Sequence, residues 1–314
     1  MTAFRDRGDF EATLDAAADQ LGLVAAVVEK DYWVSQALRA VVATHPEDFV
    51  FKGGTSLSKC FGLIERFSED IDVLVLPRDR GRAARDTLMK AMGDAAAEAI
   101  GDEEPTRDGG GGFHRTYHLT YPRKRAVGWL RPTIDLEMGI RGGPNPSERR
   151  SLEPLIRTPL HEAGVNVDEH EDLTPVELSV LHPGRTAIEK LALLSERAET
   201  CDRDPAQEFP QALGRHFYDV YMLLGDDHVQ DFLKERAVFR EVVDDCERVS
   251  QEYFRSEYTR PTNGYATSAA FKPGERLKGQ LEAALASASD LYFGQSYPTW
   301  EMVVDRANGL AHLL

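Results

Sequence analysis

Two aspartates begin an otherwise apolar segment, DIDVLVL at residues 70–76. In a β-strand, side chains two residues apart share a face, so Asp70 and Asp72 would lie together while Ile71 and Val73 point into the core. Two adjacent carboxylates need a cation, and Mg²⁺ is often held by one or two carboxylates together with substrate phosphates. The pair predicts a magnesium site, although an isolated D-x-D also fits a solvated strand edge.

The segment GGTSLSK at residues 53–59 favours the metal site over the strand edge. Its two glycines permit a tight turn, and the amides that open the following short helix can face phosphate oxygens. Lys52 and Lys59 flank the turn, and either would reach a phosphate or remain solvent exposed. We expect a nucleotide-binding segment formed by Gly53, Gly54, Thr55, Ser56 and Lys59.

GGTSLSK followed by FSEDIDVLV resembles the polymerase-β-like nucleotidyltransferase motif. Three further blocks, EKDYWV at 29–34, HPGRTAIEKLALLSER at 182–197 and RHFYDVYML at 215–223, resemble the AbiEii family of type IV toxin–antitoxin systems, which includes the MenT toxins. The resemblance implies a toxin that uses Mg²⁺ to transfer nucleotides from an NTP to the 3′ end of tRNA, which would block translation. It also implies a cognate antitoxin protein as partner.

A third carboxylate is expected on a neighbouring strand, TIDLEMG at residues 133–139, where Asp135 and Glu137 share a face. In polymerase-like transferases this acid completes the metal site or accepts the proton of the attacking hydroxyl. The resemblance favours Glu137, and Asp135 remains open. The expected metal ligands are therefore Asp70, Asp72 and Glu137.

Two charged residues lie in apolar helical segments. Lys190 in AIEKLALL must extend its ammonium to the surface or find an anionic partner, with Glu189 and Glu196 as the nearby acids. The resemblance implies instead that Lys190 contacts the triphosphate, and that Asp219 pairs with it. A structural bond from Asp219 to Arg215 is the competing interpretation.

Weaker signals concern residues around these blocks. His216 beside aromatic residues fits hydrogen-bonded packing better than proton transfer. Trp33 is expected in the core, and Lys30 and Asp31 are expected to support the nucleotide pocket. Phosphorylation of Ser68 would add about two negative charges near the metal ligands and repel a triphosphate, so Ser68→Glu is predicted to be inactive.

Basic and aromatic residues alternate between residues 115 and 131, namely Arg115, Tyr117, His118, Tyr121, Arg123, Lys124, Arg125, Trp129 and Arg131. This pattern suits a single-stranded RNA end, and a solvated hairpin explains it equally well. The net charge of −16 argues against broad nucleic-acid binding. Two other functions stay open: a transferase acting on a protein hydroxyl or small molecule, and a non-catalytic nucleotide-binding protein.

The expected fold is α/β (α+β), with a polymerase-β-like core carrying a small mixed sheet and a mostly helical C-terminal lobe. Residues 1–182 would form the nucleotidyltransferase lobe, and residues 183–314 a helical lobe contributing Lys190 and Asp219 to the cleft. Helices are predicted over 10–44 (two), 55–62 and 81–100, and strands near 48–52, 70–76, 113–122, 130–140 and 176–182. No apolar run approaches the length of a membrane span, so a cytoplasmic protein is expected.

Overall fold

The computed structural model describes residues 3–256, 258–294 and 296–314. The chain divides into two compact units. The first unit comprises Met1–Phe61, Phe67–Ile140 and Ser147–Val180, and the second comprises Gly62–Arg66, Arg141–Pro146 and Leu181–Leu314. Two short segments that precede residue 182 thus belong with the helical C-terminal part of the chain.

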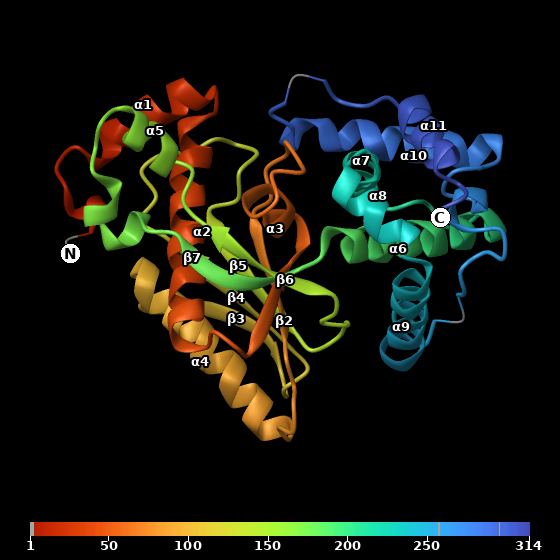
Figure 1. Cartoon of the computed structure of the whole chain (residues 1–314), viewed down its shortest axis with the longest axis horizontal. Helices are drawn as coiled ribbons and strands as arrows, with labels where there is room; N and C mark the ends of the chain where they lie inside the picture. The colour runs from red at the N-terminus through yellow and green to blue at the C-terminus, as the bar shows by residue number, and fades with distance from the viewer. Residues whose placement is uncertain (1–2, 257, 295) are drawn as a thin grey trace. The chain divides into compact units, whose positions relative to one another are not determined.

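The described strands form one mixed sheet in the order β3-β4-β5-β2-β1-β7-β6 (Figure 1). β2 pairs in parallel with β5 and antiparallel with β1, which itself runs parallel to β7. The α/β class is thereby confirmed. The strands are β1 (Phe49–Lys52), β2 (Asp70–Val75), β3 (Thr106–Gly110), β4 (His114–Thr120), β5 (Thr133–Gly139), β6 (Ser147–Leu152) and β7 (Val176–Leu181).

The two faces of this sheet differ in polarity because side chains alternate along each strand. Ile71 and Val73 of β2 and Leu136 of β5 are almost fully buried on one face, in a core shared with α2 (Ala25–Thr44) and α4 (Arg82–Ile100). Figure 1 shows both helices lying along this face. The opposite face carries the acidic residues of β2 and β5. The first unit also contains α1 (Phe10–Leu21), α3 (Gly53–Lys59) and α5 (Arg157–Glu162).

Two strands lie where the sequence analysis predicted none. β3 is made of TRDGG, a composition that favours turns, yet it pairs antiparallel with β4 from Thr106 to Gly110. β6 is made of SERRSL at the end of the sheet, where most of its residues are at least partly exposed. Neither strand has the apolar alternation that identifies a strand from sequence.

The second unit is helical in its described part. α7 packs against α6, α10 and α11, and Leu191, Leu194, Phe217 and Val220 are fully buried. Its helices are α6 (Pro183–Arg203), α7 (Gly214–Leu224), α8 (Asp227–Lys234), α9 (Arg236–Phe254), α10 (Glu275–Ser287) and α11 (Trp300–Gly309). α6 and α7 carry the two charged residues that the sequence singled out.

Candidate functional site

The acidic residues of β2 and β5 lie on one face of the sheet. The parallel register pairs Asp70 with Asp135 and Asp72 with Glu137. Register partners on adjacent strands point to the same side, so the four carboxylates project together. Asp70, Asp72 and Glu137 are only partly buried, whereas the intervening Ile71 is fully buried. This arrangement is an oxygen-rich surface that suits a hard divalent cation.

The glycine turn lies directly against the second aspartate. Lys52 pairs with Asp72 across β1 and β2, and Gly53 follows with a φ of 80°. A Cβ placed on Gly53 would lie 1.9 Å from Asp72 Oδ2. Only glycine fits here, because the φ is positive and because a side chain would collide with Asp72. The turn backbone therefore borders the carboxylate, leaving room that a side chain would fill.

The hydroxyls of the turn hold it in place. Thr55 Oγ1 donates to the carbonyl oxygen of Asp70 at 2.5 Å, and Ser56 Oγ donates to that of Gly53 at 2.9 Å. Both residues are buried. The proton of the Ser56 hydroxyl is thus used within the turn, and a contact of Ser56 with a ligand stays a prediction. Thr55 connects the turn to the strand that bears the acids.

Lys59 also has an internal partner. Its ammonium forms an ion pair with Asp31 of α2, and both side chains are 5% exposed. The other carboxylate oxygen of Asp31 accepts the N–H of Leu155 at 2.7 Å. In this structure the charge of Lys59 balances a buried carboxylate, and its phosphate contact stays a prediction. Asp31 supports the turn through the end of α3.

Asp135 lies between two basic side chains. Asp135 Oδ1 lies 2.8 Å from His118 Nδ1, and Asp135 Oδ2 lies 3.1 Å from an Arg131 guanidinium nitrogen. Hydrogen bonds to Asp135 and then Asp108 raise the pKa of His118 above its ordinary value. Arg131 also reaches Asp70 Oδ1 at 3.3 Å. Both oxygens of Asp135 are thus engaged by cationic or potentially cationic side chains.

Lys30 of α2 contacts the chain just before each of the two acidic strands. Its fully buried ammonium donates to Glu69 Oε2 at 2.6 Å and to the carbonyl oxygen of Arg131 at 3.1 Å. Glu69 Oε2 also accepts the N–H of Arg131 at 2.8 Å. Burial lowers the pKa of Lys30, and the ion pair with Glu69 opposes this. The buried ammonium of Lys30 therefore holds both Glu69, which precedes β2, and Arg131, which precedes β5.

In the second unit, Asp219 of α7 is completely buried and doubly ion-paired. Arg66 contacts both oxygens, with Nε at 2.6 Å and Nη2 at 2.8 Å, and Lys190 Nζ lies 2.8 Å from Oδ2. Burial would raise the pKa of Asp219, but the charges of Arg66 and Lys190 outweigh it and hold the pKa well below its ordinary value. Asp219 thus pairs with Lys190, as the resemblance implied, and with Arg66, a partner that the sequence did not indicate.

His216 accepts a second hydrogen bond from Lys190. Lys190 Nζ lies 2.9 Å from His216 Nδ1. Burial and the adjacent Lys190 charge lower the pKa of His216 to about 4, so the ring is neutral near pH 7 and Nδ1 is free to accept. The ammonium of Lys190 is held by one carboxylate and one imidazole.

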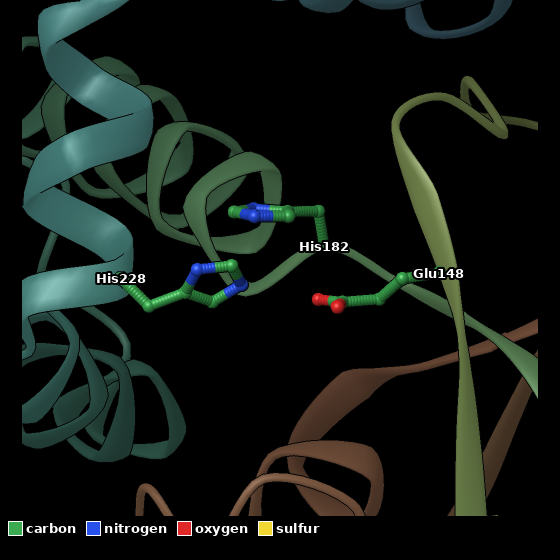
Figure 2. Close-up of side chains that lie close together, drawn as sticks. All are labelled: Glu148, His182 and His228. Atoms are coloured by element: carbon green, nitrogen blue, oxygen red, sulfur yellow. The ribbon is translucent and has the colours of Figure 1, made fainter.

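The start of α6 is fixed by a second histidine. His182 Nδ1 accepts the N–H of Gly184 at 3.0 Å, and Pro183 opens the helix. The His182 ring stacks on Phe232 at 4.6 Å and lies 4.4 Å from the ring of His228, as Figure 2 shows for the two histidines. These contacts fix the beginning of the helix that carries Lys190.

Comparison with known proteins decides the family. The family model described as "Nucleotidyl transferase AbiEii toxin, Type IV TA system" matches residues 36–306, which is most of the chain. The chain belongs to the AbiEii toxin family. No curated protein matches it. Among solved structures it is similar to MenT4, a nucleotidyltransferase toxin from Mycobacterium tuberculosis H37Rv, with 21% identity, a TM-score of 0.44, and coverage of 95% of this chain and 96% of that chain.

Membership of the AbiEii family makes this protein a nucleotidyltransferase toxin of a type IV toxin–antitoxin system. Such an enzyme uses an NTP, and such a system implies a cognate antitoxin. None of the described helices is long and apolar enough to cross a membrane.

Several supporting residues of this AbiEii protein escaped the sequence reasoning. Arg66 lies in an irregular segment where no periodicity assigns it a face. Glu29 was given no role, and Lys30 and Asp31 were expected near the nucleotide pocket without any partner being named; all three are buried. The only signal was the apolar character of the residues around them, which left those charges in need of partners.

Proposed function

We propose that this toxin transfers a nucleotide from an NTP to the 3′ end of tRNA in a Mg²⁺-dependent reaction that blocks translation. One observation carries the proposal: Asp70, Asp72 and Glu137 share a sheet face, and the Gly53 backbone borders Asp72. Magnesium held by these acids would neutralise the charge that develops on the transferred phosphate and on the leaving pyrophosphate.

The assignment of the third acid rests on the register of β2 and β5. Asp135 is engaged by His118 and Arg131 and so is assigned to holding Arg131. Glu137 is the register partner of Asp72 and is assigned to the metal. A carboxylate of this face accepts the proton of the attacking hydroxyl.

The reaction forms a bond between the acceptor 3′ oxygen and the α-phosphorus of the NTP. The bond from that phosphorus to the oxygen that bridges to the β-phosphate breaks, and pyrophosphate leaves. Lys190 is assigned to neutralising the triphosphate, and Asp219 and His216 to positioning its ammonium. The Gly53 turn is assigned to accommodating the phosphates beside Asp72.

The test is incubation of the enzyme with Mg²⁺, each α-labelled NTP separately, and total RNA and protein from cells. Label in a tRNA-sized band with the wild type, and none with Asp72→Ala, supports the proposal and identifies the nucleotide. Asp135→Asn serves as the matched control for loss of one carboxylate and should retain more activity than Glu137→Gln. Label entering protein would replace the tRNA proposal with a protein acceptor, and no transfer from any NTP would overturn both.

A further inference from the structure

The segment between β4 and β5, residues 122–132, has an unusual charge for this chain. Its sequence PRKRAVGWLRP contains four basic residues and no acidic one, in a protein whose net charge is −16. It is irregular in structure and ends where β5 begins. We call it the 122–132 loop. A local concentration of positive charge on an acidic protein points to an anionic partner.

A buried and a partly buried acid bind the backbone of the 122–132 loop at its two ends. Glu29, which is 1% exposed, accepts the N–H of Lys124 and of Arg125, each at 2.9 Å. At the other end, Glu69 accepts the N–H of Arg131, and Lys30 donates to the carbonyl oxygen of Arg131. Surface loops usually satisfy such groups with water. The loop is therefore presented in one defined conformation.

The side chains of the loop divide into an inner and an outer set. Leu130 is buried and Val127 packs beside it, in a small apolar cluster with Phe67 and two residues of α2. Trp129 lies between them in sequence but is 39% exposed. A tryptophan has more apolar area to bury than a leucine, so the exposure of Trp129 beside the buried Leu130 is costly without a ligand.

The outer set also carries the exposed charges. Arg123 and Lys124 are exposed, although Lys124 Nζ lies 4.0 Å from the exposed Glu11 Oε1, and Arg125 is paired with Asp15 at 2.7 Å. The Arg131 side chain is 55% exposed while reaching Asp70 Oδ1 at 3.3 Å. By contrast, Arg115 is buried and paired with Asp86 at 2.8 Å. Only part of the basic and aromatic pattern in the sequence is therefore available to a ligand. The available residues are Arg123, Lys124, Trp129 and Arg131, and Arg131 reaches Asp70 on the acidic face.

We propose that the outer face of the 122–132 loop binds the single-stranded end of an RNA acceptor, with a base stacked on Trp129 and phosphates at Arg123 and Lys124. This inference rests on the proposed function and names the surface by which the acceptor reaches the acids. Aromatic stacking accepts any base, and cations beside it neutralise the backbone. Arg131 links this surface to Asp70.

The variants are Trp129→Ala, Trp129→Phe and the double variant Arg123→Ala/Lys124→Ala in the full chain. Phe293→Ala is the matched control for an exposed aromatic residue, and Lys234→Ala/Lys278→Ala for two exposed cations. The first readout is binding of a fluorescent single-stranded oligoribonucleotide, measured by anisotropy without turnover. The second is the KM for RNA and for NTP in the transfer assay.

We expect Trp129→Ala to weaken oligonucleotide binding and raise the KM for RNA by about tenfold, with the KM for NTP unchanged, because one base–aromatic stack is lost. Trp129→Phe should restore most of the affinity. Arg123→Ala/Lys124→Ala should reduce the slope of log affinity against log salt by about 1, since two phosphate contacts are lost. The control variants should match the wild type.

The two readouts separate this inference from the function on which it rests. Oligonucleotide binding that all variants share, or that the wild type lacks, overturns the loop as an RNA surface even if the enzyme labels tRNA. Binding that depends on Trp129, in an enzyme that labels only protein, upholds the surface and overturns the tRNA acceptor.

Discussion

The acidic residues of the two units stand in opposite environments. Asp219 is completely buried, and ion pairs with Arg66 and Lys190 satisfy both of its oxygens. Asp70 and Asp72 are partly exposed, and the exposed side chain of Arg131 lies 3.3 Å from Asp70 Oδ1. Removing a partner from a buried pair leaves an uncompensated charge, whereas a partly exposed carboxylate can exchange its partner. The acids of the sheet therefore suit ligand binding, and Asp219 suits positioning.

The histidines of the two units show the same contrast. Hydrogen bonds to Asp135 and Asp108 raise the pKa of the half-exposed His118. Burial, followed by the charge of Lys190, lowers the pKa of His216 to about 4. The sheet face thus attracts positive charge, while the helical unit already holds its cations. Four predictions test this difference, beginning with the largest expected effect.

Asp72→Asn should reduce transfer at least about 10⁴-fold, or more than about 5 kcal/mol in activation free energy, because a metal ligand is lost. Its free energy of unfolding should stay within about 1 kcal/mol of the wild type, since the side chain is partly exposed. Rates from labelled NTP and urea unfolding curves provide both values. A variant that loses stability but keeps its activity would show that Asp72 has a structural role like that of Asp219.

Asp219→Asn should lower the free energy of unfolding by about 3–5 kcal/mol, because Arg66 and Lys190 lose a buried counter-charge. Lys190→Met should cost less, since Asp219 keeps its two bonds from Arg66. Urea denaturation monitored by circular dichroism measures both. Equal stability of Asp219→Asn and wild type would contradict the structural role.

Gly53→Ala should reduce transfer by roughly 10²-fold, because a methyl group would displace the Asp72 carboxylate. Gly22→Ala is the matched control: Gly22 also has a positive φ, of 66°, but its Cβ would meet nothing within 4 Å. The control shares the backbone strain and should keep normal kinetics. Equal loss of activity in both variants would assign the effect to strain alone.

His216→Gln should flatten the dependence of stability on pH between about 4 and 6.5. The pKa of His216 is about 4 in the folded protein and about 6.5 when unfolded, so only the unfolded chain gains a proton in that window, and wild-type stability falls as the pH falls. The expected difference is roughly 1–3 kcal/mol across the window. The free energy of unfolding measured at pH 4.5 and 7, with the exposed His312→Gln as control, tests this prediction. The same change with pH in the wild type and in His216→Gln would show that folding does not lower the pKa of His216.

Local patterns predicted the parts of this molecule that depend on local geometry. The two-residue period of a strand was enough to place Asp70 and Asp72 on one face, and to place Asp135 and Glu137 on another strand in the same way. The register that sets Asp70 beside Asp135 depends on strand pairing across 65 residues, which no local pattern contains. Secondary structure was missed where polar or glycine-rich residues form β3 and β6.

The supporting residues were harder to predict because they break the usual link between charge and exposure. Consecutive residues of α2 face different neighbours: Glu29 holds the 122–132 loop, Lys30 holds Glu69, and Asp31 holds Lys59. Arg66 reaches Asp219 across 153 positions of the chain. Such contacts follow from the tertiary fold, so a sequence can show the need for a partner but not its identity.

The most direct test of the acidic face is the binding of Mn²⁺ to the intact protein in the presence of a non-hydrolysable NTP analogue, followed by electron paramagnetic resonance. Wild type, Asp135→Asn and the surface control Lys234→Ala should bind the ion, and Asp72→Asn and Glu137→Gln should bind it at least about tenfold more weakly. Equal binding by all five proteins would contradict a metal centre formed by Asp70, Asp72 and Glu137.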